Sequence, residues 1–204
     1  MITKSGSIIQ QQGAALVVAL IMLVLMTLIG MTAMQVTTIQ SKLVSNTSDS
    51  DKAFQAAETA LKRGEDYTLL CDFSKIKERE YPFTDSCTDG LCKPTPISSD
   101  PQWLEAVGEN KIWEDTSTKT LKYGSETKPA GDASKNISSV SPLPASSVAK
   151  QPRFMIERIS DIDSLQKDIN KGWFRVTAQG YGQRMGDDGE PSSRVMLQSL
   201  IPKE

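Results

Sequence analysis

Hydrophobic residues are concentrated near the N-terminus, where they form one long run. No charged residue occurs between Lys4 and Lys42, and the residues from Ala14 to Met34 are apolar except for two threonines and a glycine. As a helix, this run spans about 31 Å, which matches a bilayer core of roughly 30 Å. The pattern predicts a membrane-spanning helix, because the run is longer than the apolar region of a cleaved signal peptide. Hydropathy alone is equally consistent with a permanent signal anchor.

Helical periodicity continues beyond the apolar run. Apolar positions recur at spacings of three, four and seven at Val36, Ile39, Leu43, Phe54, Ala57 and Leu61. We therefore expect one long helix, with a membrane half over residues 14–40 and an amphipathic half over 41–65. Gly64 is its expected stop. The stretch NTSDS, residues 46–50, is a weak point where a second helix could start.

The remaining residues, 66–204, are polar and end in three runs typical of strands. These runs are RFMIERI (153–159), GWFRVTAQG (172–180) and SRVMLQSLI (193–201). Their alternation predicts an antiparallel sheet with one solvated face, and the turn-rich segment 182–191 predicts a hairpin between the last two. Phe154 and Ile156 are expected on one face of the sheet. The predicted fold class is α+β, with the long helix laid on the sheet.

The middle of the body has fewer periodic signals. Residues 116–152 are rich in Ser, Thr, Lys, Pro and Ala, which predicts a long loop containing a short strand at 120–123. Trp103 and Trp113 flank a segment expected to form a short helix and turn. Because large aromatic side chains dominate core burial, we expect both tryptophans to pack the body against the long helix.

Charge and composition exclude several functions. The chain has 23 Lys+Arg against 25 Asp+Glu and no histidine. Without a basic excess, we predict no direct nucleic-acid binding. Without histidine, the commonest general base and metal ligand are missing. No phosphate-binding loop or paired carboxylates at a fixed spacing occur either, so the chain is predicted to be no enzyme and to need no cofactor.

The three cysteines allow one internal disulfide. Cys87 and Cys92 enclose the turn-rich sequence TDGL and can close it in an oxidising compartment. A bridge from Cys71 to either of them stays open at this point. With no histidine and one further cysteine, a four-ligand zinc site is not expected.

An acidic cluster occurs at Asp187, Asp188 and Glu190. Its oxygen atoms are of the type that binds calcium, but the spacing is not that of an EF-hand. We expect a solvated hairpin turn here, and no metal site.

A short polar leader, MITKSGSIIQQQG, precedes the apolar run and ends in Gly13. This arrangement resembles a type IV prepilin. The resemblance implies that a prepilin peptidase cuts after Gly13 and leaves residues 1–13 behind, with Ala14 as the N-methylated mature N-terminus. Most pilins carry a glutamate at the fifth residue after the cut, where this chain has Val18. A subunit without that carboxylate suits the filament tip, where no neighbour lies above it.

Further segments resemble the PilX-type minor pilins of the type IV pilus. They are the N-terminal run followed by AFQAAETAL, then CTDGLC (87–92), DPQW (100–103), QPRFMIERI, FRVTAQGYG and VMLQS (195–199). The resemblance implies an inner-membrane subunit with its body in the periplasm that later enters the extracellular pilus. It also implies a role in priming pilus assembly, upstream of adhesion, twitching motility or DNA uptake.

The same resemblance implies a set of partners. These are FimU-, PilV- and PilW-type minor pilins, the major pilin, the pilus tip adhesin and the prepilin peptidase. Two other hypotheses fit parts of the chain: the tip pseudopilin of a type II secretion system, which also lacks the buried glutamate, and a permanently anchored periplasmic binding module. The pseudopilin would require a larger body than 204 residues provide.

Overall fold

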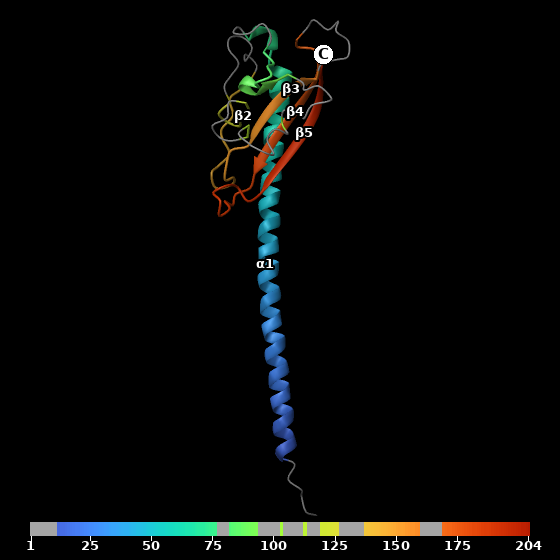
Figure 1. The fold of residues 1–204 in the computed structure, drawn as a ribbon, viewed down its shortest axis with the longest axis vertical. Helices are drawn as coiled ribbons and strands as arrows, with labels where there is room; N and C mark the ends of the chain where they lie inside the picture. The colour runs from blue at the N-terminus through green and yellow to red at the C-terminus, as the bar shows by residue number, and fades with distance from the viewer. Residues whose placement is uncertain are drawn as a thin grey trace, which may run out of the picture. The chain divides into compact units, whose positions relative to one another are not determined.

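The computed structural model describes residues 12–76, 82–93, 103, 112–113, 119–126, 137–159 and 169–204. They contain one α-helix, two short 3-10 helices and a mixed sheet (Figure 1). The chain divides into two compact units, residues 1–45 and residues 46–204, and each is described by itself.

Helix α1, Gln12–Leu70, has no break at residues 46–50 and continues past Gly64. The prediction that Gly64 ends the helix is therefore wrong. A Cβ on Gly64 would lie 2.5 Å from Cγ1 of Val176, so this glycine is needed for close packing against the sheet. Near the end of the helix, the Lys203 ammonium donates hydrogen bonds to the carbonyls of Thr68 (2.7 Å) and Cys71 (2.5 Å). A cation is favourable at a helix C-terminus because it faces carbonyls without partners in the helix.

The three predicted strands form the main part of the sheet. Strands β3 (Arg153–Ile159), β4 (Gly172–Tyr181) and β5 (Arg194–Lys203) are antiparallel neighbours in that order. Strand β2, Leu121–Lys122, pairs antiparallel with β3 and confirms the strand predicted at 120–123. Strand β1, Leu91–Cys92, pairs parallel with β3, so the sheet is mixed rather than wholly antiparallel. A strand of two residues is too short for a periodic signal, so the sequence pattern did not predict β1.

One hydrophobic cluster lies between the body half of α1 and the sheet. Its buried members are Ala60, Tyr67, Cys71, Phe73, Phe83, Leu91, Leu121, Ile137, Phe154, Ile156, Phe174, Val176 and Ala178. The rings of Phe73 and Phe174 stack at 5.5 Å between centroids, and those of Tyr67 and Phe154 meet edge to face at 6.1 Å. The predicted inward face of the strands is confirmed.

Small residues mediate the contact between α1 and β4. Ala53, Ala56, Ala57 and Ala60 are buried on the helix. A Cβ on Gly180 would overlap the backbone nitrogen of Ala57 and the carbonyl oxygen of Ala53. Phe54, which the periodicity placed on the buried face, is 44% exposed. The buried stripe follows alanines instead, because only small side chains let the strand approach the helix backbone.

A second cluster covers part of the other sheet face. It contains Cys87, Cys92, Ile112, Trp113 and Met155, with Trp103 and Met196 packed against it. The prediction that both tryptophans pack against α1 is therefore wrong. Alternation along β3 places Met155 opposite Phe154, so the face expected to be solvated is covered here. The helix and turn predicted for residues 104–111 lie outside the described residues.

Replacing Gly180 with alanine is expected to lower the free energy of unfolding by about 1–3 kcal/mol, because the new Cβ must displace the backbone of α1. Urea unfolding of the detergent-solubilised chain, followed by near-UV circular dichroism, measures this loss. Gly30→Ala is the matched control, since its Cβ meets nothing within 4 Å. Equal midpoints for Gly180→Ala and the wild type would contradict the close contact.

Candidate functional site

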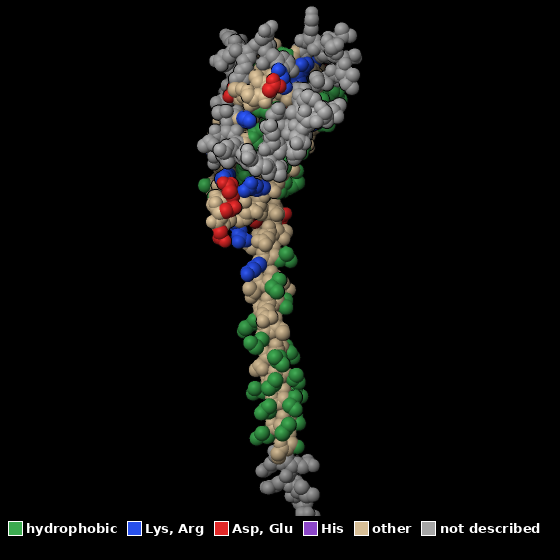
Figure 2. Space-filling model, viewed as in Figure 1, with side chains coloured by type: hydrophobic (Ala, Val, Ile, Leu, Met, Phe, Trp, Pro, Cys, Tyr) green, Lys and Arg blue, Asp and Glu red, His purple; other side chains and the backbone are tan. Residues whose placement is uncertain are grey.

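The N-terminal unit presents an apolar surface. The large hydrophobic side chains between Leu16 and Val36 are 44–75% exposed. The hydroxyls of Thr27 and Thr32 donate to the carbonyls of Val24 (2.8 Å) and Ile29 (2.9 Å). These polar groups are therefore satisfied within the helix, as a lipid environment requires. Figure 2 shows hydrophobic side chains along this unit. Helix α1 is long and apolar enough to cross a membrane.

The predicted processing residues lie at the start of this helix. A Cβ added to Gly13 would meet no atom within 4 Å, and Val18 is 56% exposed. Most of the leader lies outside the described residues. Cleavage after Gly13, methylation of Ala14 and the role of Val18 stay predictions.

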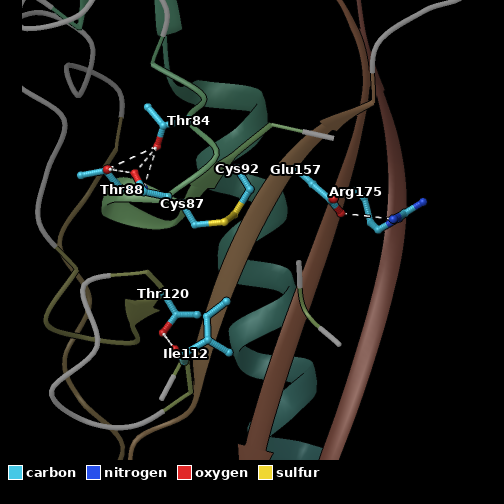
Figure 3. Close-up of a disulfide and its surroundings, with 9 residues drawn as sticks. Thr84, Cys87, Thr88, Cys92, Ile112, Thr120, Glu157 and Arg175 are labelled. Carbon is cyan, nitrogen blue, oxygen red and sulfur yellow. Dashed lines mark hydrogen bonds and ion pairs between the residues drawn. A yellow bond between two sulfur atoms is a disulfide. The ribbon is translucent and has the colours of Figure 1, made fainter. Parts of the chain in front are cut away.

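The predicted disulfide between Cys87 and Cys92 is confirmed. Both half-cystines are fully buried beside Trp113 and Met155. The hydroxyl of Thr84 accepts the backbone N–H of Thr88 (3.0 Å) and orders the loop between the cysteines (Figure 3). The loop thereby holds Cys92 in register beside β3 and covers the second face of that strand.

The loop also has backbone conformations that its sequence does not reveal. Cys87 and Asp89 adopt positive φ values of 54° and 55°, which L-residues seldom do. The remaining cysteine, Cys71, is free and buried, and burial raises the pKa of its thiol to about 12. It is therefore a neutral core residue at physiological pH.

Buried charges tie α1 to the segment predicted as a long loop. Arg63 is 6% exposed, donates to Glu126 at 2.5 Å and donates to the carbonyl of Ser138 at 2.6 Å. The two partners lie on either side of residues 127–136. Removing one member of such a buried pair leaves an uncompensated charge. The hydrophobic pattern did not predict this ion pair, because an arginine in a helix normally indicates an exposed face.

A cleft of about 480 Å³ lies beside this ion pair. It is lined by Glu58, Thr59, Lys62, Arg63, Asp66, Tyr123, Ser138 and Val140. Lys62 forms ion pairs with Asp66 (3.7 Å) and Glu65 (3.6 Å) along the helix. The cations of the cleft are thus engaged with neighbouring carboxylates, and the cleft has no excess of one charge.

The acidic cluster lies in the β4–β5 hairpin. Asp188 accepts the backbone N–H of Glu190 (3.0 Å), and Glu190 forms ion pairs with Lys150 (2.9 Å) and Arg194 (3.5 Å). The Glu190 carboxylate is thus paired with lysine and arginine side chains of the same chain. Within the described residues, no group of three or more His, Cys, Asp or Glu is arranged to hold a metal ion.

A long N-terminal helix, apolar in its first part and packed on a sheet in its last part, defines a type IV pilin-like protein. Residues 12–62 match the family model described as PilX N-terminal, and residues 77–203 match the model described as Type IV pilus assembly protein PilX C-term. The chain therefore belongs to the PilX family, whose members are minor pilins and structural components of the type IV pilus. No curated protein and no solved structure matches it.

Family and helix together make the chain a membrane-anchored pilin that interacts with other pilus components. Sequence patterns did not predict most of the residues that hold the body together. Arg63 and Glu126 carry no motif, and the alanines of AFQAAETAL indicated only a good helix former. The alanine spacing in AFQAAETAL and the glycines of FRVTAQGYG were an available signal, because small residues on both elements allow a close approach.

Replacing both Cys87 and Cys92 with serine is expected to lower the free energy of unfolding by about 2 kcal/mol, the loop-entropy value for a short loop. The tryptophan fluorescence should shift to longer wavelength, because Trp113 loses its cover. Cys71→Ala is the control, since it removes a thiol outside the disulfide and outside this cluster. Unchanged fluorescence in the double variant would contradict the role of the loop as a cover.

Proposed function

We propose that this minor pilin primes assembly of the type IV pilus and is incorporated at or near the filament tip. A prepilin peptidase cuts after Gly13, and the chain waits in the inner membrane with residues 14–40 in the bilayer and its body in the periplasm. It is then drawn out of the bilayer into the extracellular filament. The role is structural and needs no catalytic step or cofactor.

The observation that carries this proposal is the apolar surface of the helix between Ala14 and Ser41, a stretch without any charged residue. The same side chains suit two environments, because lipid tails and neighbouring apolar helices are similarly apolar. A permanent anchor needs only the first environment. The position of Val18 supports a place at the tip, where a carboxylate would find no amine from a subunit above it.

The proposed division of the chain follows from this role. Residues 1–13 are the leader, 14–40 the membrane half of the helix, 41–65 its amphipathic half and 66–204 the body. The helix itself continues to Leu70. The proposed partners are the FimU-, PilV- and PilW-type minor pilins, the major pilin and the tip adhesin.

Intact mass and N-terminal sequencing of the membrane-bound protein test the processing step. With prepilin peptidase present, we expect a chain that begins at N-methylated Ala14. In a strain without the peptidase, we expect the full leader. An intact Met1 in both strains would overturn the filament proposal and favour a permanently anchored module.

The tip position predicts a strong effect of Val18→Glu. A carboxylate without a partner amine costs several kcal/mol in an apolar setting, so the number of surface pili should fall at least about tenfold. Counting pili by electron microscopy in a strain that carries only the variant measures this effect. Val18→Gln, of similar size but uncharged, is the control and should retain most pili. Unchanged piliation with Val18→Glu would remove the support for the tip position.

A further inference from the structure

Three polar residues of α1 contact the loop that follows β4. Asn46, Asp49 and Lys52 are spaced by three, so they lie along one side of the helix. Their partners are the neighbouring residues Gln183 and Arg184. Side chains from the start of the body's helix thereby bind one end of the β4–β5 hairpin.

Asp49 is the centre of these contacts. It is 4% exposed, and its Oδ1 accepts the backbone N–H groups of Gln183 (2.7 Å) and Arg184 (2.9 Å). Hydrogen bonds to an ionised carboxylate are about twice as strong as neutral ones. Burial raises the pKa of Asp49, but hydrogen bonds from the Ser193 side chain and the two backbone N–H groups, with the nearby Arg184 charge, hold it below the ordinary value.

The flanking residues complete the arrangement. The Arg184 guanidinium donates to Oδ1 of Asn46 at 3.0 Å, and the Lys52 ammonium donates to the side-chain oxygen of Gln183. The three helix residues therefore share two partners in the loop, with Asp49 bound to both of them. None of these contacts is part of the hydrophobic core.

Gly182 makes the approach of the loop possible. A Cβ on this residue would overlap Oδ2 of Asp49, so any larger residue would displace the carboxylate. Its backbone N–H donates to the carbonyl of Ser193 (2.9 Å), and its own carbonyl accepts from the backbone N–H of Ala149 (2.7 Å). The segment bound by Asp49 is thus hydrogen-bonded to Ser193, at the other end of the hairpin turn, and to Ala149, near the end of the segment 116–152.

We propose that Asp49 is a positioning residue: with Asn46 and Lys52 it forms a hairpin latch that holds the β4–β5 hairpin on the first turns of the body's helix, residues 46–52. The boundary between the two compact units falls between Ser45 and Asn46, beside the first latch residue. The close backbone packing against Gly180 involves Ala53 and Ala57. With the latch open, the hairpin is no longer held on the helix segment before Ala53.

Amide hydrogen exchange of the full-length protein in detergent micelles tests the latch. In Asp49→Asn, the amides of Gln183 and Arg184 should exchange about 10- to 100-fold faster, as expected for lost bonds to a charged acceptor. Amides in the middle of β4, such as Val176, should change less than about twofold, since global unfolding is rarer than local opening. Asp51→Asn is the matched control, because Asp51 is exposed on the same helix turn.

Two outcomes would overturn the latch. One is unchanged exchange at Gln183 and Arg184 in Asp49→Asn. The other is an equal rise throughout the body, which would mean that Asp49 supports only global stability. If Asp49→Asn fails to fold, Asn46→Ala removes a solvent-side contact and should still accelerate exchange at Arg184 more than at Val176.

A distance measurement tests the positioning role itself. Spin labels at Glu58→Cys and Asp187→Cys, both exposed positions within the body, report the distance between the helix and the hairpin. The distance distribution should broaden in Asp49→Asn and stay unchanged in Asp51→Asn. An unchanged distribution, with fast amide exchange, would overturn the claim that the latch holds the hairpin on the helix.

Whether the latch matters for pilus assembly depends on the proposed function. The latch itself does not depend on it. Folded Asp49→Asn protein with a broadened distribution and few surface pili would link the latch to assembly. Normal piliation with the same broadening would remove that link and leave the latch in place. Loss of N-terminal processing in the wild type would contradict the proposed function without affecting the exchange results.

Discussion

The body depends on a close contact between a strand and a helix, in which glycines leave room for the backbone or side chains of the other element. Gly180 lies against Ala53 and Ala57, and Gly64 lies against Val176. This close approach brings the aromatic side chains at the far end of the helix into contact with the sheet. It also explains why the buried stripe of α1 is made of alanine rather than of larger apolar residues.

Polar side chains then fix α1 at three levels along the body. Asp49 binds the hairpin after β4, Arg63 binds both sides of residues 127–136, and Lys203 binds the end of the helix. An interface of alanine and glycine has few protruding side chains, so the helix could slide along the sheet. Hydrogen bonds to buried charges form at only one position of the helix along the sheet. A buried ion pair such as Arg63–Glu126 contributes little net stability, so we infer that its main effect is to specify one arrangement.

The disulfide loop covers the face of the sheet that α1 leaves open. Strand β3 is buried on both faces, but α1 covers only one of them. Two half-cystines, two tryptophans and Met155 form a small second cluster in place of a second helix. The loop between the cysteines is short, so its constraint is local and holds Cys92 beside the strand. The apolar N-terminal unit, by contrast, has its exposed side chains suited to lipid or to other pilin helices.

Local patterns along the chain were enough to predict the long helix, the three main strands, the hairpin and the resemblance to PilX-type minor pilins, because these depend on periodicity and on the order of motifs. They also indicated the Cys87–Cys92 disulfide among three possible pairings. The side of α1 that is buried, the packing of the tryptophans and the place of Gly64 within the helix became known from the folded chain alone. Local patterns predicted that Phe54 is buried, that Gly64 ends the helix and that Trp113 packs on α1. Contacts with distant parts of the chain decide otherwise in each case. The roles of Asp49 and Arg63 likewise depend on residues more than sixty positions away, which no local pattern can reveal.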